Sequence, residues 1–391
     1  MKKVLILMSD TGGGHRASAQ ALQAGFAQRF GDHFQVEIVD LWMKHTPFPL
    51  NQFPKSYSFL ATRTPWAWKF IWRTGGNQRT AHVILEVATR YARKSVEQLF
   101  REQRPDLVIS VHPLMQDITL AIQAHMGWDL PFVTVITDLA SIHPTWFHRQ
   151  ADLCFVASPE AFERGVALGM RPEQLRLFGL PIRPVFAQAP RPKATLRQEL
   201  GMDPDLPAAL IVGGGEGMGA VAQIARSVAD GLAGRASGGR PQGQVVVVCG
   251  RNQKLKRELA AHDWPVPVII HGFVDNMPDW MTACDCIVTK AGPGTIAEAL
   301  VRGLPILLSG FIPGQEEGNV PYVVDNGAGA FSTDPEEIAR VVARWFGPDR
   351  EQLAVLAERA KKMGNPDATL HIVEEVAKLV DKNRLFGNSR G

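Results

Sequence analysis

At 391 residues, the chain is too long for one ordinary hydrophobic core, and its length fits two domains. Hydrophobic residues make up 45% and charged residues 21%, which describes a soluble folded protein, and the net charge of +3 indicates no particular partner. The four cysteines are too few for a disulfide scaffold, and Cys284 and Cys286 lie in an apolar run without a second pair, which predicts buried thiols in a reducing compartment.

The beginning of the chain carries no recognisable targeting segment. The apolar run Val4–Met8 is too short for a signal peptide. Nowhere in the sequence is there a stretch of about twenty apolar residues, so no membrane-spanning helix is expected. These observations predict a cytosol-facing protein.

The first element is predicted to be a strand, followed by a glycine loop and a helix. Val4–Met8 is typical of a strand buried in a parallel sheet, Gly12–Gly14 allow a sharp turn, and the residues from Ala17 favour a helix. Such a loop presents backbone N–H groups and a positive helix end to a ligand. His15 is therefore either a titratable group of a site or a residue hydrogen-bonded to the backbone.

The next stretch is basic and aromatic. Residues 41–85 contain no acidic residue, and the part between 42 and 79 intersperses Lys and Arg with four of the nine tryptophans. This composition suits the headgroup layer of an anionic bilayer. Nucleic acid is a competing partner, and an ordinary pair of core helices with basic edges is the third alternative.

Polar residues follow several predicted strands. His112 comes after the strand at 107–111, Asp138 ends the strand at 131–137, and His143 follows shortly afterwards. Parallel α/β sheets bind their ligands at the carboxyl ends of strands. These three side chains are therefore candidates for one site.

A second strand–helix pattern begins after a stretch containing Pro, Arg and Lys. Residues 208–212 predict a strand, and Gly213–Gly219 form another glycine loop before a helix. The predicted organisation is a first domain at 1–185, a linker at 186–205, a second domain at 206–365, and a C-terminal helix and tail at 366–391. Two such domains that face each other across a cleft suit a nucleotide-linked donor on one side and an acceptor on the other.

Four motifs make the sequence recognisable, namely Ser9–Ala19, Gly213–Gly219, Lys290–Ala299 and Ile312–Tyr322. In this order they resemble the monogalactosyldiacylglycerol synthases, and the resemblance extends from about Val4 to about Phe346. That family is a branch of the inverting GT-B glycosyltransferases. The resemblance therefore implies an α/β fold of two Rossmann-like domains that face each other across a cleft.

The resemblance also implies an activity. It is the transfer of galactose from UDP-galactose to the free hydroxyl of 1,2-diacylglycerol, with inversion to β-monogalactosyldiacylglycerol. A UDP-glucose-dependent diacylglycerol glucosyltransferase and a non-catalytic protein that binds nucleotide sugars or lipids are the alternatives. An oxidoreductase is disfavoured, because neither glycine loop matches G-x-G-x-x-G. The expected partners are a UDP-sugar, diacylglycerol and anionic lipids such as phosphatidylglycerol, with no nucleic acid.

An inverting displacement needs a base for the acceptor hydroxyl and stabilisation of the departing UDP. His15 is the candidate base, and the helix N-terminus behind it is expected to keep the imidazole neutral. Asp138 is the second candidate, or a partner that orients the base.

Donor contacts are expected mainly from the second domain. The glycine loop and the helix opening at 292–295 offer N–H groups to the diphosphate. The resemblance assigns Glu298 to the ribose, the backbone of 272–274 to the uracil, and Gln315 and Glu316 to the sugar. The full expected donor set is Gly13, Gly14, Gly214, Gly215, Glu216, Arg251, Gly272, Phe273, Val274, Lys290, Gly292, Pro293, Gly294, Thr295, Glu298, Gln315 and Glu316.

The acceptor or lipid side is assigned to His112, His143, Trp146 and Arg16, with Trp146 expected to contact lipid. No metal or other cofactor is expected, because Asp203-Pro204-Asp205 matches D-x-D only in letters and lies in a proline turn. The expected location is the cytoplasmic face of a bacterial cell membrane, as a peripheral protein.

Overall fold

The computed structural model describes residues 1–10, 13–46, 48, 50–52, 64, 66, 78–215, 217, 220–234 and 239–386. By their contacts, Met1–Pro184, Ile312–Gly318 and Pro366–Gly391 form one compact unit, and Val185–Phe311 and Asn319–Asn365 form a second. Each unit contains a parallel sheet of six strands.

The first sheet has the strand order β2-β1-β3-β4-β5-β6. The elements of this unit are β1 (Lys2–Met8), α1 (Gly14–Phe30), β2 (Phe34–Asp40), α2 (Leu41–His45), α5 (Gln78–Gln103), β3 (Leu107–Ser110), α6 (Gln116–Met126), β4 (Phe132–Val135), β5 (Leu153–Val156), α7 (Pro159–Ala167), β6 (Leu175–Leu177) and α16 (Ala368–Phe386).

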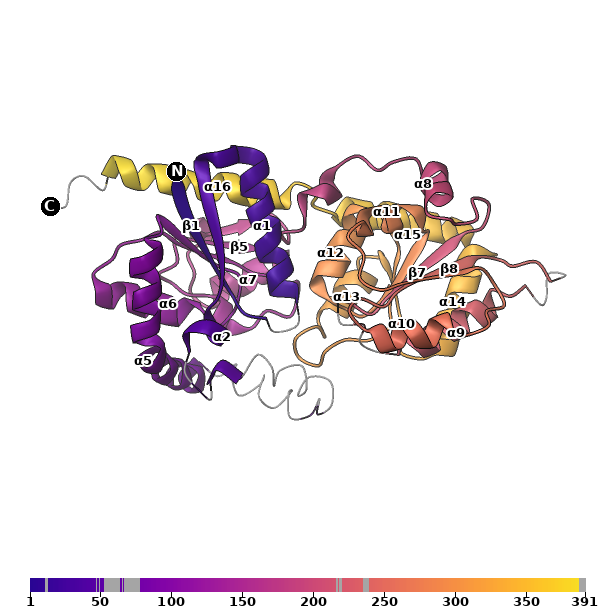
Figure 1. The fold of residues 1–391 in the computed structure, drawn as a ribbon, viewed down its shortest axis with the longest axis horizontal. Helices are drawn as coiled ribbons and strands as arrows, with labels where there is room; N and C mark the ends of the chain where they lie inside the picture. Colours follow the sequence, from indigo (N-terminus) through magenta and orange to yellow (C-terminus); the bar gives the residue numbers. More distant parts are fainter. Residues whose placement is uncertain are drawn as a thin grey trace. The chain divides into compact units, whose positions relative to one another are not determined.

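The continuous apolar run of β1 is explained by burial on both faces of this sheet. Val4 and Ile6 pack in one cluster with α1 and with Ile372 of α16, whereas Leu5 and Leu7 pack in another with α5 and α6 (Figure 1). Successive strand residues point to opposite faces, so a strand between two helical layers is apolar at every position.

The second sheet has the order β12-β11-β10-β7-β8-β9. The elements of this unit are α8 (Lys193–Glu199), β7 (Ala208–Val212), α9 (Val221–Gly231), β8 (Gln244–Val248), α10 (Gln253–Ala260), β9 (Val268–His271), α11 (Met277–Ala283), β10 (Cys286–Thr289), α12 (Pro293–Val301), β11 (Ile306–Leu308), α13 (Asn319–Val324), β12 (Gly329–Phe331), α14 (Pro335–Phe346) and α15 (Arg350–Met363).

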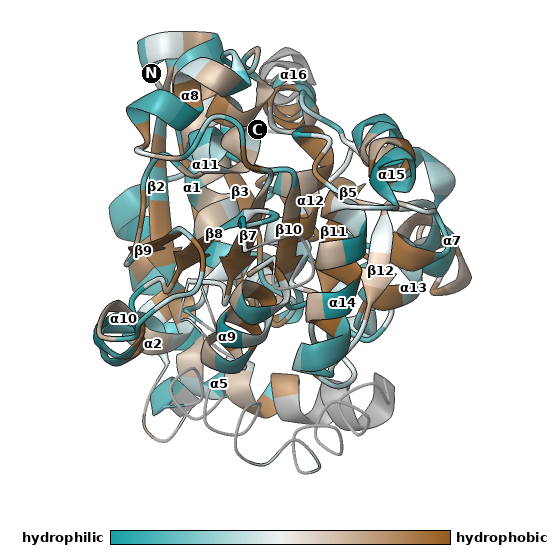
Figure 2. Ribbon diagram, turned by 90° about the vertical axis from the view of Figure 1, so that its right-hand side faces the viewer, coloured by the Kyte–Doolittle hydropathy of each residue, from teal (hydrophilic) through white to brown (hydrophobic). Residues whose placement is uncertain are grey.

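Hydrophobic residues concentrate on the inner strands of this second sheet. Figure 2 shows β7, β8 and β10 in brown, while α9, α10 and α14 carry teal, hydrophilic residues among the hydrophobic ones. The carboxyl ends of β7, β8, β9 and β10 meet at one edge, because all the strands run in the same direction. This edge is where an α/β sheet offers loops to a ligand.

Two segments outside the predicted domain cores join a unit through specific contacts. In the predicted linker, α8 is attached to the second unit by Arg197, whose guanidinium donates to the Asp285 carboxylate at 2.6 Å and to the Ala283 carbonyl at 2.9 Å. In the predicted C-terminal segment, α16 packs on the first unit, where Thr369 donates to the Ile182 carbonyl at 2.6 Å.

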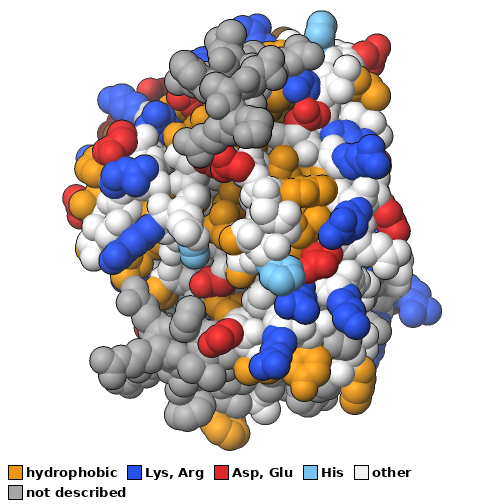
Figure 3. Space-filling model, turned by 90° about the vertical axis from the view of Figure 1, so that its left-hand side faces the viewer, with side chains coloured by type: hydrophobic (Ala, Val, Ile, Leu, Met, Phe, Trp, Pro, Cys, Tyr) orange, Lys and Arg blue, Asp and Glu red, His pale blue; other side chains and the backbone are white. Residues whose placement is uncertain are grey.

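The described surface is mixed in character. Figure 3 shows acidic and basic side chains interspersed over one face of the molecule, with small groups of hydrophobic side chains between them. This distribution agrees with the small net charge of +3.

The packing of α16 gives a stability prediction. Ile372 is fully buried, so Ile372→Ala is expected to lower the free energy of unfolding by about 2–5 kcal/mol through lost burial and a residual cavity. Lys378→Ala, on the same helix, removes only a surface ion pair with Glu375 and is expected to cost about 0–1 kcal/mol. Urea unfolding followed by circular dichroism measures both, and equal losses would contradict the packing of α16 in this core.

Candidate active site

His15 lies at the carboxyl edge of the first sheet, at the start of α1. Gly13 precedes the helix with a φ of +79°, a conformation that glycine adopts without strain. The neighbouring Thr11 and Gly12 fall outside the described residues. The His15 side chain is turned inward, because the residue is only 7% exposed. Its Nδ1 lies 2.8 Å from the Thr137 hydroxyl oxygen.

Two aromatic rings surround the His15 imidazole. The ring centroid of His112 is 4.6 Å away and that of Trp146 is 6.0 Å away. His15, His112 and Thr137 follow β1, β3 and β4, which are consecutive in the sheet. The structure thus brings His15 and His112 together, and it places His112 in the interior, where it is 3% exposed.

Burial determines the protonation of both histidines. It lowers the pKa of His15 to about 4, while a hydrogen bond to the backbone of Val111 and the charge of Asp10 act in the opposite direction. Burial also lowers the pKa of His112 well below its usual value, and the neighbouring His15 lowers it further. Burial alone therefore favours the neutral imidazole, which the sequence predicts on the basis of the helix N-terminus.

The carboxylate of Asp138 does not orient His15 directly. It accepts a hydrogen bond from the Trp146 indole N–H at 2.6 Å, and the residue is 4% exposed. Burial raises the pKa of Asp138 to about 7, the Trp146 hydrogen bond lowers it, and the nearby Glu316 carboxylate raises it. The side chain beside His15 is that of the preceding residue, Thr137.

The prediction that Trp146 contacts lipid is wrong. Trp146 is completely buried and packs in a cluster with Ile136 and Val156. Its backbone carbonyl also accepts a hydrogen bond from the Gln116 amide at 3.3 Å. A tryptophan whose indole N–H has a buried partner and whose ring has no exposed area is a core residue.

Arg16 and His143 have partners within the first unit. The Arg16 guanidinium donates to both oxygens of Asp10, with Nε 2.7 Å from Oδ1, and this pairing raises its pKa. The Asp10 N–H in turn donates to Asp40 at 3.0 Å. His143 Nδ1 lies 2.7 Å from the Thr145 hydroxyl. The sequence did not single out Asp10 and Asp40, which fasten the ends of β1 and β2 to α1.

The loop Ile312–Gly318 joins the first unit through its contacts. The buried Glu316 carboxylate accepts the Ile312 N–H at 2.9 Å, and the Gly318 N–H donates to the Ser141 hydroxyl at 2.7 Å. Gln315 is half-buried next to Glu316. The loop is thus held by its own carboxylate and by a serine that follows β4.

In the second unit, two glycine loops pack directly on each other. Arg251 N–H donates to the Gly215 carbonyl at 2.8 Å. A Cβ on Gly217 would lie 2.4 Å from the Cys249 carbonyl oxygen, and one on Gly250 would lie 2.4 Å from the Gly215 carbonyl oxygen. Glycine is therefore required at both positions. Glu216, predicted to bind the donor, lies outside the described residues.

The other predicted donor residues follow β8, β9 and β10 at the same edge of the second sheet. Gly272, Phe273 and Val274 follow β9, and the Arg251 guanidinium lies 5.6 Å from the centroid of the exposed Phe273 ring. The Lys290 side chain follows β10 and passes 3.6 Å from the Cβ position of Gly214. The Lys290 side chain thus lies beside the glycine loop, whereas the Arg251 guanidinium lies over the Phe273 ring.

The helix α12 starts at the same edge. Pro293 is its first residue and Gly292 its N-cap, as the sequence predicts, and the Cβ position of Gly294 is open. Thr295 and Glu298 are half-buried on the helix. The free N–H groups of this helix end can receive an anion.

Several other predictions concern residues away from these sites. All four cysteines are free and buried, as expected for Cys284 and Cys286. Asp205 lies in a bend at residues 204–206, and its N–H donates to the carboxylate of Asp203, which precedes the bend, at 2.9 Å. Within the described ranges, no group of three or more His, Cys, Asp or Glu side chains is placed to hold a metal ion.

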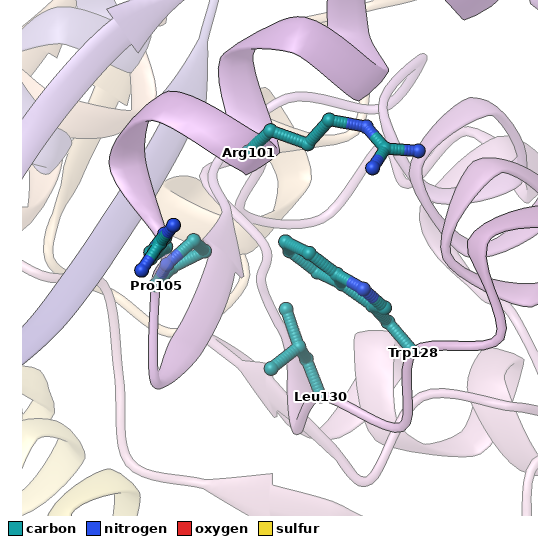
Figure 4. Close-up of a pocket in the computed structure, with 5 residues that line it drawn as sticks. Arg101, Pro105, Trp128 and Leu130 are labelled. Atoms are coloured by element: carbon teal, nitrogen blue, oxygen red, sulfur yellow. The ribbon is translucent and has the colours of Figure 1, made fainter.

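A separate cavity of about 510 Å³ lies at the amino-terminal end of the first sheet. Figure 4 shows Arg101 from the end of α5, Pro105 ahead of β3, and Trp128 and Leu130 ahead of β4 around it. None of the predicted site residues lines this cavity.

Comparison with known proteins identifies the family. Residues 15–182 match the model of the monogalactosyldiacylglycerol (MGDG) synthase family, and residues 208–369 match the C-terminal domain of glycosyltransferase family 28. Monogalactosyldiacylglycerol synthase 1 of Arabidopsis thaliana is 49% identical over 384 residues, which are 97% of this chain and 72% of that protein. The chain belongs to the monogalactosyldiacylglycerol synthase family.

Solved structures confirm the fold expected for this family. A crystal structure of Acinetobacter baumannii MurG is 17% identical and gives a TM-score of 0.62 over 97% of this chain and 100% of that chain. The Staphylococcus aureus MnaA–UDP structure is 16% identical and gives 0.61 over 97% of each chain. The two parallel sheets and these neighbours confirm the predicted α/β GT-B fold.

The predicted bacterial location is wrong for this MGDG synthase family member. The Arabidopsis relative and the matching proteins of soybean, spinach and tobacco are named as chloroplastic plant enzymes, so the expected cytoplasmic face of a bacterial membrane is contradicted. Among the described helices, none has the length and apolar character needed to cross a bilayer.

Asp138 and His15 predict opposite effects of pH on stability. The folded protein holds the Asp138 proton up to about pH 7 and the unfolded protein only up to about 3.8, so stability decreases as pH rises through this range. For His15 the unfolded protein binds the proton more tightly, between about pH 4 and 6.5, so stability increases as pH rises there.

We therefore expect Asp138→Asn to gain stability relative to the parent protein as pH rises from about 4 to 7, and His15→Gln to lose it. Thermal unfolding followed by circular dichroism across that range measures both differences. Curves that stay parallel to that of the parent protein would contradict the assigned burial of these two groups.

Proposed function

We propose that this protein transfers galactose from UDP-galactose to the free hydroxyl of 1,2-diacylglycerol, with inversion to β-monogalactosyldiacylglycerol. The observation that carries the proposal is the 49% identity, over 97% of the chain, to an enzyme named for that product. UDP as the donor nucleotide is supported by the MnaA–UDP structure, which shares the fold.

His15 is the proposed base. Its imidazole is neutral above about pH 4 and can therefore accept a proton at physiological pH. The acceptor oxygen attacks the anomeric carbon from the face opposite UDP, and its proton passes to His15 as the new C–O bond forms. The bond between the anomeric carbon and the phosphate oxygen breaks, and its electron pair leaves with UDP.

The second unit is proposed to bind and stabilise the departing UDP. Backbone N–H groups at the start of α12 and in the glycine loop suit the diphosphate. Lys290 adds positive charge beside that loop, and Arg251 adds it beside Phe273. Glu298 is proposed to hold the ribose and the backbone of 272–274 the uracil. In this proposal the charge of the leaving group is neutralised by the protein itself, and no metal cofactor takes part.

The loop Ile312–Gly318 is proposed to bind the sugar of the donor. Gln315 and Glu316 are assigned to the hexose hydroxyls, and the Glu316 carboxylate is already fixed by the Ile312 N–H. Asp138 accepts a hydrogen bond from the Trp146 indole and is proposed to fix that ring next to the imidazole of His15.

Contact with the lipid surface is proposed for the basic, aromatic stretch between 42 and 79, most of which lies outside the described residues. Within it, Trp42 is buried and packs with α5, so it is a core residue. Phe48 and Trp66 are 79% and 77% exposed and fit insertion between headgroups. Anionic lipids such as phosphatidylglycerol are the proposed partners of the basic residues.

Replacing His15 tests the proposed chemistry. With diacylglycerol micelles and labelled UDP-galactose, His15→Ala is expected to lower turnover about 100-fold or more while UDP still binds, because only the proton acceptor is removed. Glycolipid formation and UDP calorimetry measure the two effects. Near-normal turnover would remove His15 from this role, and product from labelled UDP-glucose alone would change the donor.

Replacing the exposed aromatics tests the membrane contact. Phe48→Ser combined with Trp66→Ser is expected to reduce flotation with phosphatidylcholine–phosphatidylglycerol vesicles, because the apolar area that enters the bilayer is removed. Val355→Ser, at an exposed position of α15 in the second unit, is the matched control and is expected to float as the parent protein does. Unchanged flotation of the double variant would refute this contact.

A further inference from the structure

The His15 side chain is held by a neutral hydroxyl group rather than by a carboxylate. Thr137 Oγ1 lies 2.8 Å from His15 Nδ1, and both residues are buried, at 5% and 7% exposure. The nearby carboxylates are engaged elsewhere. Asp138 accepts from Trp146, and Asp10 is paired with Arg16. The hydroxyl of Thr137 thus occupies the position that an aspartate has in a Ser-His-Asp triad.

The backbone around Thr137 is fixed on both sides. The Ile136 N–H donates to the Phe155 carbonyl of β5 at 2.9 Å, and the Leu139 carbonyl accepts from the Ser158 hydroxyl at 2.7 Å. Threonine is branched at Cβ, so few χ1 rotamers are open to it. The hydroxyl is therefore carried on a rigid segment and can hold the imidazole in one orientation.

The tautomer of His15 determines which ring nitrogen has a lone pair available to accept a proton. A base needs one nitrogen with an available lone pair, and a neutral imidazole has only one such nitrogen. If the Thr137 hydroxyl donated to Nδ1, that lone pair would be used and Nε2 would carry the proton. A basic His15 therefore requires the opposite arrangement, in which Nδ1–H donates to Thr137 Oγ1 and the backbone of Val111, the other hydrogen-bond partner of the ring, does not accept from Nε2.

We propose that Thr137 is the positioning residue of His15, and that it holds the ring as the Nδ1–H tautomer with Nε2 left to take the acceptor proton. This inference rests on the proposed transferase function. After proton transfer, the imidazolium still donates Nδ1–H to Thr137, so the orientation is kept through the reaction. A hydroxyl orients the ring without adding negative charge, in contrast to a carboxylate partner.

The chain offers a matched set of variants for the test. Thr137→Val keeps the shape and removes the hydroxyl, whereas Thr137→Ser keeps the hydroxyl. Thr134→Val makes the same change three residues earlier, on β4, where the buried Thr134 hydroxyl has no hydrogen-bond partner among the described residues.

We expect Thr137→Val to lower kcat about 10- to 100-fold with little change in KM for UDP-galactose, because a misoriented base affects the chemical step. Thr137→Ser is expected to restore most of the rate, and Thr134→Val to leave it unchanged. In ¹⁵N spectra of histidine-labelled protein, Thr137→Val is expected to shift His15 away from the single Nδ1–H form of the parent protein.

Each result bears on one claim. If the parent protein makes no glycolipid from either UDP-sugar, the proposed function fails and this role fails with it. If the parent protein is active and Thr137→Val is equally active, with an unchanged His15 tautomer, the positioning role alone is overturned. A loss in Thr134→Val as large as that in Thr137→Val would show a general packing effect and would overturn the role too.

Discussion

The site depends on the burial of one imidazole. His15 is 7% exposed at the start of α1, with His112 at 4.6 Å between ring centroids and the Thr137 hydroxyl at 2.8 Å. Removal from water keeps the ring neutral, and the hydroxyl fixes its direction without adding charge. The loops after β1, β3 and β4 place His15, His112 and Thr137 together. The Trp146 ring packs beside His15, and its indole N–H donates to Asp138.

Residue patterns in the sequence predict much of this arrangement. Buried apolar strands and glycine loops give two parallel sheets, and the rule that ligands bind at carboxyl strand ends brings His15, His112 and Asp138 toward one edge. Such patterns do not predict which way each side chain points or which group it hydrogen-bonds. Adjacent residues after β4 point in different directions, so Thr137 contacts the base and Asp138 contacts Trp146. The only feature of the sequence that points to Thr137 as a site residue is its position directly before Asp138.

The errors have related physical causes. Trp146 looks like a lipid contact because tryptophan is common at membrane interfaces, but burial in a core cluster gives it a polar partner and no exposed surface. For His15 the sequence suggests the helix N-terminus but not burial, which is the largest cause of the lowered pKa. In the second unit the predicted phosphate contacts are mostly backbone N–H groups. The need for glycine at 217 and 250 comes from close approaches to carbonyl oxygens of another loop, and these are seen only in the three-dimensional structure.

The most direct test is the titration of His15 itself, observed in ¹⁵N-histidine spectra with His15→Gln used to assign the signal. A buried base held by Thr137 predicts a neutral Nδ1–H imidazole throughout the neutral range, with protonation only as pH approaches about 4. A His15 that titrates near the ordinary value of 6.5, or that carries its neutral proton on Nε2, would contradict the account.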